Sequence, residues 1–491
     1  MKLYKNIILL SVCISGLFMA LSCESILEEE NRSQLSPENL LTTELGITTV
    51  IANAYSILND LISSRNHVKR EEFTTDQMWQ TGGGENGTAV SLIGFLWDSN
   101  ATLEAFDWGR YWNVIRDTNT VLDNIDNVGG IDDVKKQNLT AEARFLRAQA
   151  YYMLYIQYGT LPIRTSLSDP QQLARASEEE FKTFMETEFL EALPNLPAPG
   201  SEPNYGRINS GGAKGLLCKW YLNTKQWQKC VNTANDIIDD ATYSLYPSYF
   251  DLFSLENKRN SEFMLVRTGL ANEPNSVNFI ATGLPPGYKV GLDGGMENAV
   301  NNTWSNFASQ YRLYDEFYNS FEEGDTRRSR ILTRYEQANG NVVNLLATPD
   351  NIRAAKYPPD PATQGERHGN DFPIVRYADI LLSKAEALNE LSGPNQESVD
   401  LINEIRNRAQ LFTDKSLTDF PTKESLRDHI LDERRWEFWY EGHRRTDLLR
   451  MGKFLESAIS RGFGAQEKHK LFPIPQGEID ANTLLVQNPG Y

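Results

Sequence analysis

The sequence has few of the residues and motifs that mark metal-dependent, redox or nucleotide-binding enzymes. Its 491 residues include only four cysteines and five histidines. It contains no HExxH, GxSxG, Walker A or EF-hand pattern. A hydrolase built on this chain would have to work without the motifs that usually place a nucleophile, a zinc ion or a phosphate. No metal ion or cofactor is therefore predicted.

Positive charge is also scarce. Lysine and arginine total 48, against 66 aspartate and glutamate residues, which gives a formal net charge of -18. A surface this acidic repels phosphate backbones, so general nucleic-acid binding is excluded. After the N-terminal segment no apolar run reaches the 18 or so residues of a membrane-spanning helix, which excludes a multi-span membrane protein.

What the chain has in quantity is apolar and aromatic side chains. Hydrophobic residues make up 40% of it, with nine Trp, 21 Tyr and 22 Phe. Such a chain can bury a large core, so wholesale disorder is excluded. The length allows either about three ordinary domains or one large helical domain.

The first 22 residues read as a secretion signal. Lys2 and Lys5 precede an apolar run from Ile7 to Leu21, too short to span a bilayer, and Ala20–Cys23 (ALSC) is similar to a lipoprotein lipobox. We therefore predict a lipoprotein signal peptide over residues 1–22 and lipidation of Cys23, whose acyl chains would anchor the protein to a membrane. The alternative is an ordinary secreted protein cut nearby. Residues 23–35, which include the acidic stretch ESILEEE, are predicted to form an acidic tether, either a sorting signal or a plain spacer.

Helical periodicity dominates the mature chain. Apolar residues recur at helical spacing in residues 50–58, 108–122, 141–158, 213–239, 376–410 and 424–449. Gly159 and Pro162 should end the third of these helices. Long segments without periodicity, residues 194–210 and 268–306, are rich in proline and glycine, and loops of such length are often functional. The sequence therefore predicts a mainly α scaffold that carries large loops.

The helix pair predicted over residues 213–239 places two cysteines opposite each other. Cys218 and Cys230 fall at the two small-residue positions of a tetratricopeptide unit. Two cysteines without a nearby third and fourth ligand do not make a zinc site. We expect them to pack where the paired helices come closest, with a disulfide as the lesser alternative.

Several phrases resemble one family over essentially the whole mature chain. They are AEARFLRA (141–148), YIQYGTLP (155–162), PIVRYADILLSKAEA (373–387), INEIRNRA (402–409), ERRWEFWYEGHRRTDL (433–448) and LFPIPQ (471–476). Together with the lipobox, they are similar to the SusD/RagB family of outer-membrane lipoproteins. The resemblance implies four tetratricopeptide-like helix pairs that carry a loop-rich, irregular half. It also implies a single domain over residues 36–491, with an N-terminal region of about 36–240 and a C-terminal region of about 265–491.

Two features resemble enzyme motifs but are better explained structurally. Glu433, Glu437 and Glu441 share one helix face, interleaved with arginine and aromatic residues. Because glycosidase carboxylates face each other across a cleft, we predict structural ion pairs here instead. The segment Gly82–Gly87 satisfies GxGxxG, but no apolar strand is expected before it and no clear helix after it, so a flexible loop is predicted.

Aromatic side chains in loops are the candidate ligand-binding residues. A sugar ring can stack its apolar face on an indole or phenol while its hydroxyls find polar partners. The other six tryptophans lie on predicted helices with core periodicity, which leaves Trp79, Trp97, Trp304 and, after a Pro-Pro-Gly turn, Tyr288. The resemblance points to the same two loop regions. The hydroxyl contacts would come from Asp76, Gln77 and Asn86. The competing interpretation of each aromatic is that it fills its own loop.

The function implied by the resemblance is nutrient capture outside the cell. We expect a lipid-anchored, surface-exposed outer-membrane protein that binds an oligosaccharide and passes it to a SusC-like TonB-dependent transporter. The alternatives are a peptide-binding member of the same family and, less favoured, an extracellular hydrolase.

Overall fold

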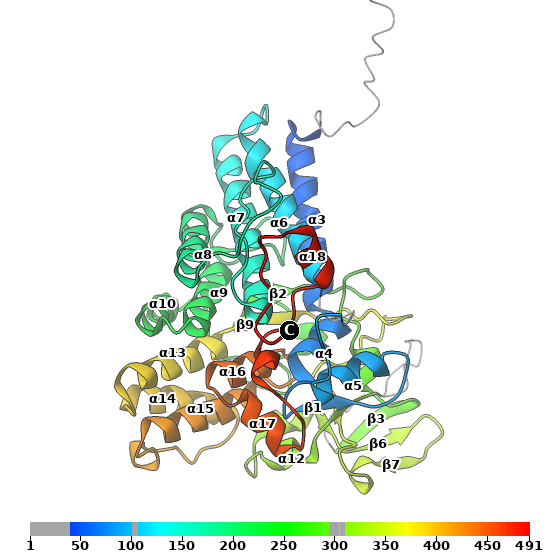
Figure 1. Ribbon diagram of the computed structural model, residues 1–491. Coiled ribbons are helices and arrows are strands. Elements are labelled where there is room, and N and C mark those ends of the chain that lie inside the picture. Colours follow the sequence, from blue (N-terminus) through cyan, green and yellow to red (C-terminus); the bar gives the residue numbers. More distant parts are fainter. Residues whose placement is uncertain (1–39, 101–106, 294–303, 305–309) are drawn as a thin grey trace, which may run out of the picture.

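The computed structural model describes residues 40–100, 107–293, 304 and 310–491 (Figure 1). The predicted signal peptide, Cys23 and the predicted tether lie outside these residues. The described helices are α3 (Glu44–Ile62), α4 (Arg65–Glu72), α5 (Asn86–Gly94), α6 (Trp108–Asn124), α7 (Asp133–Tyr158), α8 (Glu178–Ala192), α9 (Ser210–Asn223), α10 (Trp227–Asp239), α11 (Ile280–Gly283), α12 (Asp315–Asn319), α13 (Tyr377–Ser392), α14 (Gln396–Arg408), α15 (Lys423–Glu437), α16 (Arg444–Arg450), α17 (Phe454–Ser460) and α18 (Gln476–Ala481).

The long helices form four successive pairs. α3 packs on α6, α7 on α8, α9 on α10 and α13 on α14, while α6 contacts α7 and α10 contacts α13 across successive pairs. In Figure 1 they run from the top of the molecule down its left side, while β3, β6 and β7 lie with α4 and α5 at the lower right and β2 and β9 lie near the centre, beside the helices. The predicted fold class, a tetratricopeptide-like scaffold carrying an irregular half, is confirmed.

Local sequence signals define most of the helix boundaries. The side chains of Asp132, Ser177 and Thr422 accept hydrogen bonds from the first turns of α7, α8 and α15. These bonds stabilise the helix starts, because the backbone N–H groups of a first turn have no partner within the helix. The helix predicted over residues 141–158 ends at Tyr158 as expected, but it begins eight residues earlier. The helix pairs predicted over 213–239 and 376–410 are confirmed.

The helix predicted over residues 424–449 is wrong as a single element. α15 ends at Glu437 and α16 begins at Arg444. Between them Tyr440 and Gly442 adopt positive φ angles of 63° and 77°, a conformation that a right-handed helix does not allow. Phe438 and Tyr440, which lie in this interruption, are nevertheless buried in the core. The apolar spacing of the sequence therefore continues through the turn, although the helix does not.

The strands are short and form four antiparallel ribbons. They are β1 (Met78–Gln80), β2 (Phe263–Arg267), β3 (Tyr288–Asp293), β4 (Tyr311–Leu313), β5 (Ile331–Leu332), β6 (Arg334–Gln337), β7 (Val342–Asn344), β8 (Arg353–Ala354) and β9 (Phe372–Arg376). The pairings are β1 with β4, β2 with β9, β5 with β8, and β3–β6–β7 in that order. Every pair joins segments that are distant in sequence, except β6 with β7.

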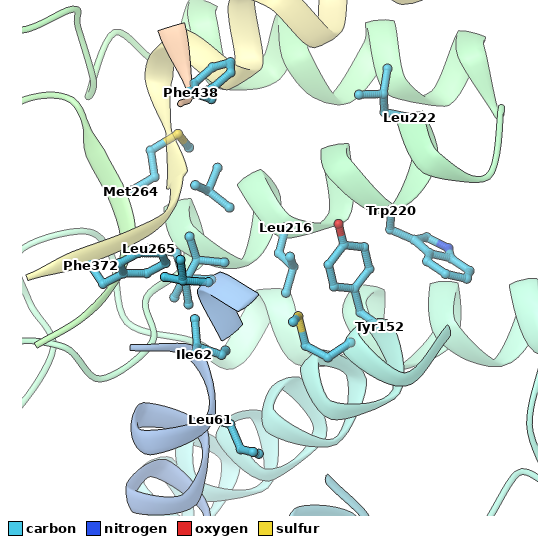
Figure 2. Packing of buried hydrophobic residues seen from close by; sticks show 14 of the residues in the cluster. Leu61, Ile62, Tyr152, Leu216, Trp220, Leu222, Met264, Leu265, Phe372 and Phe438 are labelled. Carbon is cyan, nitrogen blue, oxygen red and sulfur yellow. The ribbon is translucent and has the colours of Figure 1, made fainter. Parts of the chain in front are cut away.

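The β2–β9 ribbon joins the helical scaffold to the irregular half, and it lies directly on α9. A β-carbon added to Gly212 would come within 2.7 Å of the Met264 carbonyl oxygen, and one added to Gly215 within 2.9 Å of a Val375 methyl carbon. Figure 2 shows Met264 and Leu265 of β2 packed near Leu216 of α9 and Phe372 of β9. Glycine is therefore required where the ribbon approaches the helix.

Cys218 and Cys230 face each other between α9 and α10. Both side chains are buried thiols, with their sulfur atoms 3.7 Å apart. Small-residue packing is therefore confirmed as their arrangement in this structure, because a disulfide requires sulfur atoms about 2.05 Å apart.

Within the described residues, α3 has the length and composition to cross a membrane. Its buried residues, however, include Ile47, Ile51, Ala54 and Leu58, spaced along one face that packs on α6. This spacing is that of a core helix in an α-helical scaffold.

We predict that Gly212→Ala lowers the free energy of unfolding by about 1–3 kcal/mol, because the new methyl group meets backbone rather than a flexible side chain. The measurement is urea unfolding followed by circular dichroism. Gly109→Ala is the control: Gly109 is exposed in α6 with open space around it, so alanine should raise stability by up to about 1 kcal/mol. Equal effects of the two substitutions would contradict a close approach at α9.

Candidate functional site

Trp97 is a core residue. Its side chain is 1% exposed and packs on Phe95, His469 and Phe472, and its indole N–H donates a 2.7 Å hydrogen bond to the Tyr491 hydroxyl. The prediction that Trp97 offers an exposed face to a ligand is wrong. Apart from Phe95, these partners come from the C-terminal segment, far away in the sequence.

Tyr288 and Trp304 are buried as well, so the expectation that they are exposed is also wrong. Tyr288 begins β3 and packs on Tyr335 of β6, with ring centroids 5.7 Å apart. Trp304 is 8% exposed and meets the His368 ring edge-on at 5.8 Å. Its buried indole N–H has no hydrogen-bond partner within the described residues. Whether either residue contacts a ligand stays a prediction.

Trp79 is the predicted aromatic that keeps contact with solvent. It lies in β1, is half-buried and donates its indole N–H to the Asp350 carbonyl oxygen at 2.9 Å. The Arg312 guanidinium lies 5.3 Å from the center of the indole, and the Tyr314 ring lies nearly parallel at 6.4 Å. Arg312 has no carboxylate partner within the part of the chain that the structure describes, so its positive charge is available beside the indole.

Sequence reasoning missed Arg312 and Tyr314. Trp79 pairs directly with Arg312 across the β1–β4 ribbon, a pairing between segments more than 200 residues apart. Neither strand is longer than three residues, so no alternation pattern was available to reveal the pairing. Among the described ring contacts, none joins two of the four predicted aromatics. The structure therefore does not assemble them into one described platform.

Asp76 has a structural role in place of the predicted hydroxyl contact. Arg444 binds both carboxylate oxygens at 2.8 Å, and Arg435 approaches to 3.3 Å. Burial alone would raise the pKa of Asp76, but the two guanidinium groups outweigh it and hold the pKa well below its usual range. Asp76 thus fixes the segment before β1 to α15 and α16.

Gln77 and Asn86 also have internal partners. Gln77 is buried and donates its amide to the Arg435 carbonyl oxygen at 2.9 Å. Asn86 accepts a 2.8 Å hydrogen bond from the Gly82 N–H and begins α5, so a clear helix does follow the glycine-rich segment. The expectation that no clear helix follows this segment is therefore wrong. The dinucleotide interpretation still fails, because β1 belongs to a two-stranded antiparallel ribbon and not to a parallel βαβ unit.

The three glutamates on α15 and the turn after it are structural, as predicted. Glu433 binds Arg327 at 2.8 Å, Glu437 binds Arg376 at 2.8 Å, and Glu441 binds Lys356 at 2.6 Å. Burial raises the pKa of Glu441, but the Arg376 and Lys356 cations outweigh it, so its pKa lies below the ordinary value. A carboxylate held ionised and enclosed by cations cannot serve as a general acid.

We predict that Asp76→Asn lowers the free energy of unfolding by about 3–5 kcal/mol, because it leaves two largely buried guanidinium groups without their anion. Thermal and urea unfolding measure this loss. Asp98→Asn is the control, since Asp98 is exposed on the same N-terminal stretch and should change stability by less than about 0.5 kcal/mol. If Asp76→Asn lowers the affinity for a glycan but leaves the stability unchanged, Asp76 has a role in ligand binding and not in the fold.

The pH dependence of stability should include a contribution from His443. Burial, reinforced by the Lys219 ammonium 3.2 Å away, lowers the pKa of His443 to about 3. The unfolded chain, with an ordinary pKa near 6.5, therefore binds the proton first as pH falls, so stability is lost between about pH 6.5 and pH 3. We predict that His443→Gln reduces this slope by about 1 kcal/mol per pH unit between pH 6 and pH 4, as measured by urea unfolding. An unchanged slope would show that His443 is protonated in the folded state.

Comparisons with known proteins agree with this architecture. Residues 240–491 match the family model described as "SusD family", and residues 26–222 match "Starch-binding associating with outer membrane". SusD-like protein P25 of Formosa agariphila is 25% identical, over 97% of this chain and 98% of its own. The starch-binding protein SusD of Bacteroides thetaiotaomicron is 24% identical, over 86% and 84%. The structure of a laminarin-binding SusD-like protein superposes with a TM-score of 0.76 at 23% identity, over 92% of this chain and all of the other. The chain belongs to the SusD family.

Proposed function

We propose that this protein binds a glycan at the outer surface of the cell and has no catalytic activity of its own. The observation that carries the proposal is the surface of Trp79: a half-buried indole fixed by its bond to Asp350, beside the Arg312 cation. The family supports it, because one matching model is described as starch-binding and similar proteins are named for binding starch and laminarin.

The geometry at Trp79 suits a sugar ring. Stacking a pyranose on the indole removes apolar C–H groups from water, and a guanidinium next to the ring can donate two hydrogen bonds to neighbouring hydroxyls. One such platform contributes about 1–2 kcal/mol. Binding through a few contacts of this size gives dissociation constants near the millimolar range, which suits a protein that must release what it captures.

The remaining parts of the proposal concern location and partners. Residues 1–22 would be removed as a signal peptide, the Cys23 thiol would carry the lipid, and residues 23–35 would act as the tether of the single domain over residues 36–491. The cargo would pass to a SusC-like TonB-dependent transporter in the outer membrane. Lipid chains at Cys23 would hold the protein beside that transporter without a membrane-spanning helix.

The test is calorimetric titration of the protein lacking residues 1–23 with maltohexaose, laminarihexaose and a control hexapeptide. We expect saturable binding of a hexasaccharide, no product with time, and about tenfold weaker binding for Trp79→Ala, because the stacking surface is lost. Trp227→Ala is the matched control, since Trp227 is also half-buried but lies in α10, on the helical scaffold, and its affinity should match the wild type.

Each contrary outcome has a separate meaning. Binding of the hexapeptide alone would overturn the glycan assignment, and accumulation of shorter sugars would overturn the non-catalytic assignment. Wild-type affinity in Trp79→Ala would move the site elsewhere on the same protein. Trp97→Ala should instead lower the melting temperature, because it opens a cavity in the core.

A further inference from the structure

Two grooves meet at the segment Asn204–Arg207, which leads from the proline-rich loop into α9. The first groove, of about 480 Å³, lies between residues 199–209 and residues 259–266. The second, of about 370 Å³, lies between the same segment, α3 and residues 268–275. All four residues of the segment line both grooves, so they form a shared wall. Each volume lies in the range of small-molecule binding sites.

The wall is held rigidly. The Tyr205 hydroxyl donates a 2.5 Å hydrogen bond to the buried Asp371 carboxylate and accepts one from the Arg259 backbone N–H at 3.2 Å. Arg207 binds Glu142 through its Nε at 2.6 Å. Gly206 has φ +91°, and a β-carbon there would come within 2.5 Å of a Thr268 methyl carbon. A wall fixed at three consecutive residues is pre-organised, which lowers the entropic cost of binding.

The polar groups left over in the first groove suit a polyhydroxylated, uncharged ligand. Arg259 is exposed, has no carboxylate partner within the described residues, and holds its guanidinium 4.3 Å above the Tyr205 ring. Glu202 lines the same groove; one carboxylate oxygen accepts the Gly200 N–H at 2.8 Å and the other has no partner within the described residues, so one cation and one anion balance. The Asn204 amide makes no hydrogen bond within the described chain. Sugar hydroxyls both donate and accept, so they can use a guanidinium, a carboxylate and an amide together.

The second groove supplies aromatic and apolar surface. Half-buried Tyr55 and exposed Pro274 line it together with Asn59. Tyr205 borders both grooves while Arg259 borders only the first, so Tyr205 is the aromatic residue that the two grooves share. Apolar surface next to unpartnered amides is the pattern that sugar rings require.

We propose that these two grooves form a second saccharide-binding site, separate from Trp79 and specific for neutral sugars, with Tyr205 as the stacking residue between them. Arg259, Glu202 and Asn204 bind hydroxyls in the first groove. Asn59 does so in the second. The site stands on the geometry of this wall and does not depend on the Trp79 surface.

The experiment uses the protein with all tyrosines replaced by 3-fluorotyrosine, in the Trp79→Ala background, so that the proposed Trp79 site is removed. Tyr205→Phe identifies the Tyr205 fluorine resonance by its loss. The probes are neutral hexasaccharides of glucose, mannose, galactose and xylose, each titrated to about 10 mM. We expect at least one to shift the Tyr205 resonance saturably, because the sugar ring lies against the phenol.

The variants then separate binding from folding. Tyr205→Ala and Arg259→Ala should each weaken the affinity at least fivefold, and Arg259→Ala keeps the backbone N–H bond to Tyr205. Tyr318→Ala is the matched control, because Arg328 lies 4.9 Å above that ring outside both grooves, and it should leave the affinity unchanged. The proposal is overturned if none of the four sugars shifts the Tyr205 resonance, or if Arg259→Ala and Tyr318→Ala have equal effects. Either result leaves the Trp79 proposal standing, since that site is tested with Tyr205 intact.

Discussion

The structure depends on a network of charges that is fully removed from water around Arg376. This residue ends β9 and precedes α13, and its guanidinium binds Glu437 and Glu441 at 2.8 Å as well as Glu262 beside β2. Further cations from α14 and from the strand segments close the network. An unpaired charge in such a place would be strongly destabilising, so each partner fixes the position of the others. Scaffold helices, the joining ribbon and the irregular half are thus held in one arrangement.

This use of charge gives the acidic, arginine-containing motif a structural role. The α15 carboxylates are the most enzyme-like residues of the chain, yet each is enclosed by cations and aromatic rings, as where Arg376 lies 4.6 Å over Phe438. The space beside His443 and Glu441 measures about 40 Å³, room for little more than water.

The helices could be predicted from the sequence because their signals are local: apolar spacing, N-capping residues and terminal glycines all lie within one element. The same reasoning misplaced the aromatics, because burial is decided by segments that are remote in sequence. Trp97 looked exposed in a glycine-rich stretch, but its partner Tyr491 lies 394 residues away. Nothing in the sequence around Asp76 indicates that its carboxylate is paired, because its partner Arg444 lies in α16. The grooves beside Tyr205 could not be foreseen either, since they exist only where α3, β2 and the proline-rich loop converge.

The scaffold and the binding surfaces are therefore not separate parts. The wall at Asn204–Arg207 is also the link that leads into α9, and the glycines that follow it let the β2–β9 ribbon lie against that helix. Because the wall is also a structural connection, it keeps its conformation when no ligand is bound. Binding there therefore requires little loss of conformational entropy. Two weak surfaces on one rigid body would also favour long chains over short ones. A glycan that reaches both benefits from a high effective concentration at the second surface, whereas a single sugar unit does not. Retention would then fall as soon as the chain leaves one surface.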